Sequence, residues 1–426
     1  MSININAVCA IKKAMSYCFL FLGLSTAPLF AGAASMDIQA RFSPDPANPL
    51  VNKFINTTPP SGFCAEQYTV CDYYNFFSLR TPLSFVSSNA IPGRHSDPRQ
   101  GAMFKVPADW KTFTVTKVSG GGSVASETVE MKVRIAGVGA RYRLSDTASN
   151  LVGRPDSDHE LLWSRQPWIT APSPCRGTSI TTHNEREYNF FWLTPVAGTC
   201  AKTAAYTIPG FEYSGFDIGY ELQTPEPLKM SQGIYTGSVT YQVGPHGDFD
   251  MGDNMLPSES SLTLNFTLEV QHALKVEIPP GGHQIELVPQ GGWQAWLNQG
   301  RKPVRLFRDQ TFNVSASSRF KMQLECQYPA GNTCALRDAG SVHLVPLNTS
   351  VTLPNGLTDA TGQAVQRRPL RLDGSGTELF QPGFYLDRKP GTLHFEIARE
   401  HVESMLSEGV RKTYSGDVTV IWDSEV

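Results

Sequence analysis

The sequence predicts an all-β chain of two immunoglobulin-like β-sandwich domains, of which the C-terminal one lacks its last strand. Short runs of alternating apolar and polar residues recur along the chain, and 36 glycines and 30 prolines supply turns between them. Runs at this density are typical of a sandwich. The third observation is a strand motif that occurs twice, and it predicts where the second domain is incomplete.

The repeated motif occupies residues 235–241 and 414–420, which share Tyr, Gly, Val and Thr at equivalent positions. After the first copy comes a further alternating run, Ser261–Val270, which can pair beside it. After the second copy only residues 421–426 remain. If the copies occupy equivalent places, the second domain exposes an apolar groove until another chain supplies a strand. The alternative is an ordinary last strand in a complete sandwich.

Length and charge set the broad class. With 426 residues and 40% hydrophobic content, the chain can form two domains, each with its own core. A net charge of -3 gives no polyanion-binding signature, so nucleic acid is not an expected partner.

The N-terminus has the pattern of a secretory signal peptide. Lys12 and Lys13 precede an apolar stretch that ends in Ala31-Gly32-Ala33-Ala34, so we expect residues 1–33 to be removed. A membrane anchor is the alternative, but the apolar run is short and Pro28 interrupts it. We therefore expect a soluble, exported mature protein.

Six cysteines remain after removal of the signal peptide, an even number that favours disulfides in an exported chain. Six cysteines allow fifteen connectivities. The simplest joins neighbours: Cys64 with Cys71, Cys175 with Cys200, and Cys326 with Cys334. Zinc is disfavoured because the spacings are not those of zinc ligands.

In chain order, residues 34–61 are predicted to be an irregular or edge segment. The runs 112–118 and 128–135 predict a hairpin, with Gly120–Ser123 at its tip. The domain boundary is predicted near His272, which gives an N-terminal domain of residues 34–271 and a C-terminal domain of residues 272–426.

The second domain shows further strand-like runs and one plausible short helix, at His401–Leu406. The runs are 273–278, 283–288, 312–315, 320–324, 342–345 and 393–397. In the terminal strand Val418, Val420 and Trp422 fall on one face, which predicts that this face is buried.

The Tyr-x-Gly-x-Val terminal strand, the run Gly291–Leu297 and the run Phe320–Cys326 resemble the CblD-like pilus initiators. These are the CfaE-like tip adhesins of class 5 (alpha) chaperone-usher fimbriae. The resemblance covers essentially the whole mature chain. It implies a receptor-binding domain followed by an incomplete pilin domain, whose missing strand a periplasmic chaperone supplies first and a major pilin subunit replaces at the outer-membrane usher.

The resemblance also implies a place at the fimbrial tip and contact with a host-cell glycan or glycoprotein. We expect no cofactor or metal. A tip subunit needs no donor arm, and Pro44, Pro46 and Pro49 make the segment after the signal peptide a poor donor. The donor-strand groove is predicted to be lined by Val418, Val420, Trp422, Leu274, Val276 and Ile278.

One family feature is missing. CfaE-like members carry paired arginines near the last strands of the adhesin domain, whereas residues 242–253 contain no arginine and three aspartates, Asp248, Asp250 and Asp253. Their spacing could suit calcium, but no bidentate Glu follows at the required place, so a solvated hairpin loop is favoured.

The receptor contacts are predicted from aromatic and basic residues. Asp72–Asn75 is read as a polar-aromatic loop held by a disulfide. The aromatic residues could offer stacking platforms for a sugar, but most of them are expected in the core; they are Tyr73, Tyr74, Phe76, Phe77, Trp163, Trp168 and Trp192. The candidate receptor-binding residues are Tyr73, Tyr74, Arg80, Arg176 and Arg186.

No catalytic motif supports an enzyme, and carboxylate pairs such as Glu185 and Glu187 are common on solvated faces. The function predicted is therefore adhesion and initiation of pilus assembly. The main alternative is a self-contained secreted carbohydrate-binding or structural β-sandwich protein, and a secreted glycosidase is a third possibility.

Overall fold

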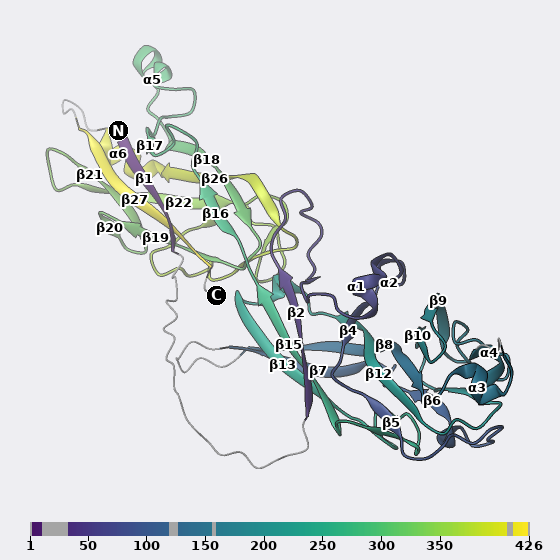
Figure 1. Ribbon diagram of the computed structural model, residues 1–426. Coiled ribbons are helices and arrows are strands. Elements are labelled where there is room, and N and C mark those ends of the chain that lie inside the picture. Colours follow the sequence, from purple (N-terminus) through teal and green to yellow (C-terminus); the bar gives the residue numbers. More distant parts are fainter. Residues whose placement is uncertain (1, 11–32, 119–126, 156–158, 407–411, 425–426) are drawn as a thin grey trace, which may run out of the picture.

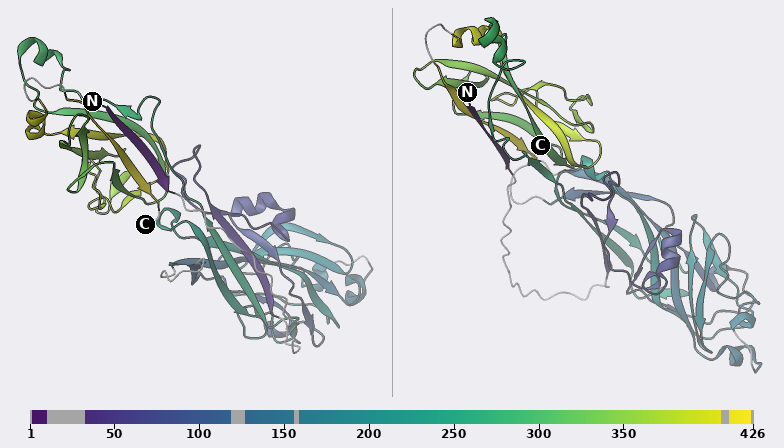
Figure 2. Two further views of the ribbon diagram at one scale, coloured as in Figure 1. Left: turned by 90° about the vertical axis from the view of Figure 1, so that its left-hand side faces the viewer. Right: turned by 90° about the horizontal axis from the view of Figure 1, so that it is seen from above.

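The structure is a computed structural model that describes residues 2–10, 33–118, 127–155, 159–406 and 412–424; for residues 2–10 only the backbone is described. It is an all-β fold with two large curled sheets and a few short helices, as the sequence predicted. Figures 1 and 2 show the elements of residues 34–270 gathered in one body and those of residues 274–423 in another.

The first sheet has the strand order β14-β5-β12-β8-β7-β13-β15-β2-β3, with β10 on β8, β9 on β10 and β4 on β12. Its strands are β2 (Ala34–Phe42), β3 (Ile55–Asn56), β4 (Phe77–Arg80), β5 (Phe85–Ser87), β7 (Lys111–Lys117), β8 (Thr128–Leu144), β9 (Arg176–His183), β10 (Glu187–Leu193), β12 (Phe211–Gln223), β13 (Gly233–Gln242), β14 (Met255–Pro257) and β15 (Ser261–Val270). A separate pair joins β6 (Ala102–Lys105) to β11 (Thr199–Lys202).

The second sheet has the order β16-β18-β26-β22-β21-β27-β1-β17, with β19 on β27, β20 on β21 and β24 on β22. Its strands are β1 (Ser2–Ala10), β16 (Leu274–Glu277), β17 (Gln284–Ile285), β18 (Leu306–Ala316), β19 (Lys321–Cys326), β20 (Pro329–Ala330), β21 (Thr333–Asp338), β22 (Leu344–Thr352), β24 (Arg368–Pro369), β26 (Leu386–Ile397) and β27 (Tyr414–Asp423). The short strands β23 (Leu357–Asp359) and β25 (Phe380–Pro382) pair with each other.

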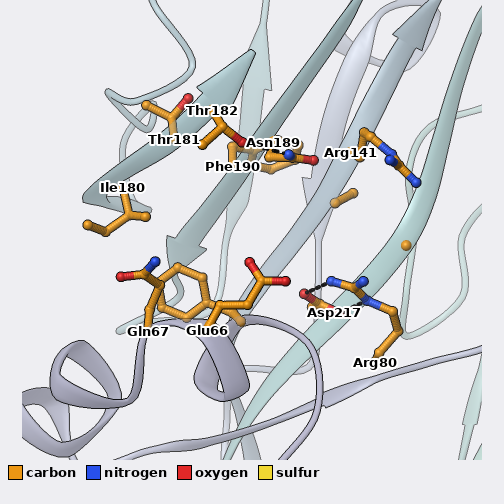
Figure 3. A pocket seen from close by; sticks show the side chains of 13 residues that line it. Glu66, Gln67, Arg80, Arg141, Ile180, Thr181, Thr182, Asn189, Phe190 and Asp217 are labelled. Atoms are coloured by element: carbon orange, nitrogen blue, oxygen red, sulfur yellow. Dashed lines mark hydrogen bonds and ion pairs between the residues drawn. The ribbon is translucent and has the colours of Figure 1, made fainter. Parts of the chain in front are cut away.

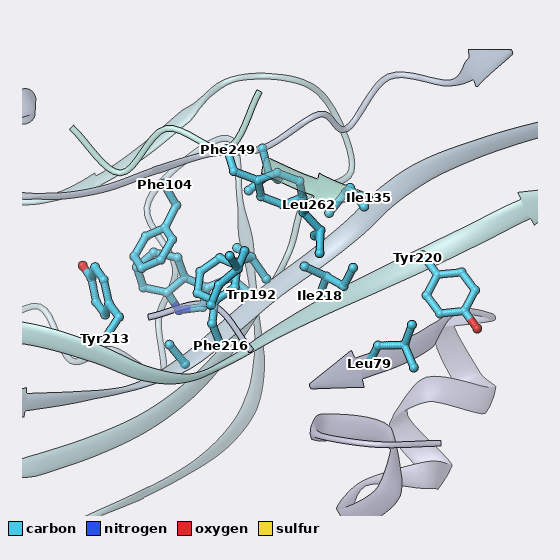
Figure 4. Packing of buried hydrophobic residues seen from close by; sticks show 14 of the residues in the cluster. Leu79, Phe104, Ile135, Trp192, Tyr213, Phe216, Ile218, Tyr220, Phe249 and Leu262 are labelled. Atoms are coloured by element: carbon cyan, nitrogen blue, oxygen red, sulfur yellow. The ribbon is translucent and has the colours of Figure 1, made fainter. Parts of the chain in front are cut away.

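Each sheet closes over its own apolar core, because alternate strand positions point to the same face. The first core begins at Ala34 and ends at Val270, and the second begins at Leu274 and ends at Trp422. Figure 4 shows part of the first core, where Phe104, Trp192 and Tyr213 pack together. Trp163, Trp168 and Trp192 are fully buried and Phe76 nearly so, as expected for most of the aromatic residues. Phe77 differs, because it is 41% exposed.

The predicted hairpin forms, with β7 antiparallel to β8. Its predicted tip, Gly120–Ser123, lies outside the described residues, as do residues 11–32 of the predicted signal peptide. The segment 34–61 is not irregular throughout: Ala34–Phe42 forms β2, whose Ile38, Ala40 and Phe42 are buried. It still lies close to the edge of the sheet, with only the short β3 beyond it.

The structure contains more short helices than the sequence analysis predicted. The predicted helix at 401–406 is present as α6 (Arg399–Met405), but short helices also form at α1 (Phe63–Glu66), α2 (Tyr68–Tyr74), α3 (Ala148–Val152), α4 (His159–Leu162) and α5 (Gln294–Gln299), and 3-10 turns at Pro98–Gln100 and Pro227–Lys229. Asp72–Tyr74, read as a loop, is the last turn of α2, and Asn75 ends it in the left-handed conformation. One or two helical turns are too short to show a 3.6-residue period. Among the described residues, no helix has the length and hydropathy to span a bilayer.

Candidate functional site

The two copies of the repeated strand motif lie on β13 and β27, and their neighbours differ in one respect. In the first sheet β13 pairs along its whole length with β15, which is antiparallel to it. On its other side β15 pairs with β2, which is parallel. The strand that follows the first copy in sequence therefore fills the place beside it, as predicted.

In the second sheet the same place beside β27 is filled by β1. Nine residue pairs join the two strands, from Ser2 with Ser415 to Ala10 with Asp423, and the pairing is parallel. On its other side β1 pairs with β17 through Ile3 with Ile285 and Asn4 with Gln284. β1 thus lies between β27 and β17, as β15 lies between β13 and β2.

The direction of β1 is the difference that matters. A strand that returns from a hairpin runs antiparallel to its predecessor, as β15 does, whereas β1 runs parallel to β27. No turn after β27 could place a strand in this direction. The slot beside β27 is therefore occupied by a segment more than four hundred residues distant in sequence.

The residues predicted to line this slot lie on two strands. Val418, Val420 and Trp422 on β27 are completely buried, and Leu274 is nearly so. Val276 and Ile278 are partly buried against the second core. Because β16 pairs with β18, its residues border the slot less directly than Ile285 does, which the sequence reading did not select. The run 283–288, which contains Ile285, was predicted as a strand, but its alternation does not show that it borders the slot beside β27.

A second candidate site is a pocket of about 190 Å³ in the first sheet. Helix α1 contributes Phe63 and Glu66, β9 contributes Thr181 and Thr182, and β10 contributes Asn189 and Phe190. The other lining residues are Gln67, Arg80, Ala140, Arg141, Ile180, Gly215 and Asp217. Figure 3 shows Arg80 and Arg141 on one side and Gln67 and Ile180 on the other.

Arg80 is held in place by Asp217. Its Nε and Nη2 atoms donate to Oδ1 and Oδ2 at 2.8 and 3.0 Å, a two-point contact that fixes the plane of the guanidinium. Burial raises the pKa of Asp217 despite these hydrogen bonds, and the bonds in turn raise the pKa of Arg80. The Arg80 side chain remains half exposed, so its Nη1 donors are available to a ligand.

The rest of the pocket offers a mixture of charged, polar and aromatic groups. Arg141 is half exposed, and its nearest acid is Glu187 at 3.9 Å. Asn189 Nδ2 donates to Thr182 Oγ1 at 2.7 Å, which leaves the amide oxygen as an acceptor. The Phe63 ring stacks on Phe191 at 4.2 Å and gives the pocket an apolar wall. A rigid arginine, amide and hydroxyl groups and an aromatic ring can together orient a small polar ligand.

The predicted receptor-binding residues are not brought together. Arg80 lines the pocket, while Tyr73 and Tyr74 are exposed on α2. Arg176 begins β9, and Arg186 donates to Asp146 at 3.3 Å in a separate shallow hollow. The sequence reading missed Arg141, Thr182, Asn189 and Asp217, because alternation within a strand does not show which distant strand lies beside it.

The three cysteine pairs predicted as simplest are the disulfides observed: Cys64–Cys71, Cys175–Cys200 and Cys326–Cys334. The first links α1 to α2 beside the pocket. Within the described residues no cluster of His, Cys, Asp and Glu could hold a metal ion.

The solvated-loop reading of the three aspartates is wrong for Asp250, which is 1% exposed. Arg99 donates from Nη1 to Asp250 at 2.8 Å and from Nε to Asp253 at 2.9 Å. Burial opposes ionisation of Asp250, but the hydrogen bonds from Arg99 and the Gly252 N–H hold its pKa below its usual value. Asp248 accepts from the Gln242 N–H. Arg99 is 151 residues away from Asp250 in the sequence, so no local pattern announces the pair.

Comparison with known proteins gives matches among solved structures alone: no family model and no curated protein matches the chain. Solved structures to which it is similar include tip adhesins of chaperone-usher fimbriae. One is CfaE, the adhesive subunit of CFA/I fimbria of enterotoxigenic Escherichia coli, at 9% identity and a TM-score of 0.22, covering 92% of this chain and 98% of that one. Another is the CsuC–CsuE chaperone–tip adhesion subunit pre-assembly complex of Acinetobacter baumannii, at 7% identity and a TM-score of 0.18, covering 91% and 98%.

Proposed function

We propose that this chain is a minor fimbrial subunit that sits at the pilus tip, binds a host-cell glycan or glycoprotein, and initiates pilus assembly by accepting a donor strand. The observation that carries the proposal is the slot between β27 and β17, filled in parallel by a segment that lies within the predicted signal peptide. Removal of residues 1–33 takes this strand away, and another chain must then supply it.

An empty slot is costly for two physical reasons. It leaves the β27 edge without its partner over nine residue positions, and an unpaired edge is a template for a strand from another chain. It also uncovers the face that carries Val418, Val420 and Trp422. Burial of one such side chain contributes about 1.5–3 kcal/mol, so three are comparable with the net stability of a domain.

The expected donors are a periplasmic chaperone and then the major pilin subunit at the outer-membrane usher. The segment Ala34–Phe42, which follows the predicted signal peptide, is paired with β15 in the first sheet and is therefore not free to act as a donor arm. The proposed division is an adhesin domain at residues 34–271 and a pilin domain at residues 272–426, which fits the change of core between Val270 and Leu274. This function is binding and strand exchange, without chemistry.

The peptide of residues 2–10 tests the assembly half of the proposal. Added to the chain of residues 34–426, the peptide should raise the unfolding temperature, and the rise should grow with peptide concentration. At a peptide concentration of one hundred times its Kd, the free energy of unfolding should increase by about 2.7 kcal/mol. A peptide with proline at residues 5 and 7 is the control, because proline cannot donate to a ladder. Full stability of residues 34–426 as a monomer, unchanged by the peptide, would contradict the proposal.

The pocket beside Arg80 supports the receptor half. Glycan-array binding by the full chain should fall when Arg141 is replaced by Gln. Arg143→Gln is the matched control, because Arg143 lies two residues along the same strand, outside the pocket and with similar exposure. Equal loss in both variants would place the receptor site elsewhere.

A further inference from the structure

A second hollow lies on the outer face of the second sheet, two strands away from the slot beside β27. It measures about 500 Å³, and four segments form it: residues 332–333, 348–350 on β22, 367–371, and 394–396 on β26. In β22 and β26 the inward positions carry Val351, Leu393 and Phe395, all fully buried. The intervening positions Ser350, His394 and Glu396 therefore point outward into the hollow.

A polar network fixes one wall of the hollow. Asp309 Oδ1 contacts His394 Nδ1 at 2.7 Å, and His394 Nε2 contacts Thr352 Oγ1 at 2.8 Å. Because a carboxylate can only accept, Nδ1 carries a proton, and in the neutral ring Nε2 accepts from the Thr352 hydroxyl. The same hydroxyl oxygen accepts the Arg367 N–H at 3.1 Å. The network therefore anchors the backbone of Arg367.

Arg367 is held in an unusual conformation, with a φ of 45°. Left-handed backbone costs about 1–2 kcal/mol in a residue with a Cβ, and such strain concentrates at binding sites. The network through Thr352 and His394 opposes this cost. It holds Arg367 in the lining of the hollow, which also includes Arg371.

The two arginines have little internal compensation. Arg367 approaches Asp309 no closer than 3.7 Å, and the hydrogen bond made by Arg371 is to the Ser375 hydroxyl at 2.9 Å. The one acid in the lining, Glu396, is paired with Arg305 at 3.2 Å. A hydrogen bond from the Ser375 N–H, and also the charge of Arg371, lower the pKa of the neighbouring Asp373. The hollow therefore presents positive charge that is only partly compensated.

We propose that this hollow binds the acidic group of a saccharide, a carboxylate or a sulfate. Planar guanidinium groups match both anions through two parallel hydrogen bonds. The Asn348 and Ser350 side chains also line the hollow and can bond sugar hydroxyls, and Pro369 and Leu370 contribute apolar lining. This site is separate from the pocket beside Arg80. It gives the proposed pilin domain, residues 272–426, a binding role in addition to its role in assembly.

The test is a calorimetric titration of the full chain with 3′-sialyllactose and a sulfated chondroitin disaccharide, with lactose as the uncharged comparison. Replacing Arg367 by Asn and Arg371 by Gln together should weaken binding of one of the acidic sugars about tenfold or more, because bonds to charged groups are lost. Added salt should weaken the same binding in the unaltered chain.

Arg388→Asn is the matched control. Arg388 has a φ of 48°, its N–H also donates to a hydroxyl, that of Ser315, and it lies outside the hollow. Ser350→Trp is a second variant, which fills the hollow while both arginines remain and should abolish the same binding. Saturable binding that survives both the double variant and Ser350→Trp, or no saturable binding of either acidic sugar, overturns the proposal.

Discussion

The ion pair between Arg80 and Asp217 in the pocket depends on Gly62. Its φ is 66°, and a Cβ built there would lie 2.3 Å from Asp217 Oδ1. Any side chain would therefore meet both backbone strain and the carboxylate that holds Arg80. Glycine permits α1 to begin directly against the ion pair.

We predict that Gly62→Ala lowers the free energy of unfolding by about 2–4 kcal/mol, from the left-handed backbone and the displaced carboxylate together. Gly153→Ala is the control, because Gly153 has a φ of 72° but nothing within 4 Å of its Cβ position. Denaturant unfolding of both variants measures the difference. Equal losses would show that the contact with Asp217 adds nothing.

Lys202 is 2% exposed, and its ammonium donates to the carbonyls of Gln166, Pro167 and Thr170 at 3.2, 3.0 and 2.7 Å. Burial lowers its pKa to about 8, from 10.5. Between these two values the unfolded chain binds more protons than the folded one. The contribution of Lys202 to stability therefore rises with pH across this window.

Lys202→Met should remove that rise. Between pH 8 and pH 10.5, the free energy of unfolding of the unaltered chain should rise by up to about 3 kcal/mol relative to that of the variant. Denaturant unfolding of both proteins at several pH values measures this difference in the free energy of unfolding. The contributions of the other titrating groups cancel, because both proteins contain them. A difference that stays flat or falls across this range would contradict the lowered pKa.

At the scale of elements, β27 shows how one strand can serve two purposes. Its Val418, Val420 and Trp422 complete the core, and its edge pairs with β1. The alternation of its sequence predicts which face is buried. It does not predict the neighbour, since backbone groups pair with any strand of suitable direction.

Val420→Asp should abolish incorporation into fibres while the first domain stays folded, because it places a charge in a fully buried position. Thr419→Asp is the control, since Thr419 is on the opposite face of the same strand and only partly buried. Piliation of cells that carry each variant provides the readout. Normal piliation with Val420→Asp would exclude the proposed groove.

At the scale of the whole molecule, the two cores share no residue, and only Gln271–Ala273 separates them. His272 spans the link: its Nε2 contacts the Met230 carbonyl at 2.8 Å and its Nδ1 contacts Ser317 Oγ at 3.2 Å. Burial lowers the pKa of His272, so the neutral ring is favoured in this position. The two halves are joined closely but fold around separate apolar clusters.

Separate expression follows from this arrangement. Residues 34–271 should resist limited proteolysis, because β15 completes their sheet. Residues 272–426 should be degraded unless the peptide of residues 2–10 or a chaperone is supplied. Stable, protease-resistant folding of residues 272–426 alone would mean that their sheet is complete without a donor.

The sequence by itself determined the all-β class, the repeated strand, the buried face of β27 and the cysteine pairs, because alternation and short loops are local properties. Only the tertiary structure decided that residues 2–10 lie parallel to β27, that Asp217 fixes Arg80, and that Arg99 neutralises Asp250. These contacts join residues from 137 to more than four hundred positions apart. They depend on which strands the fold brings side by side, and no local pattern records that choice.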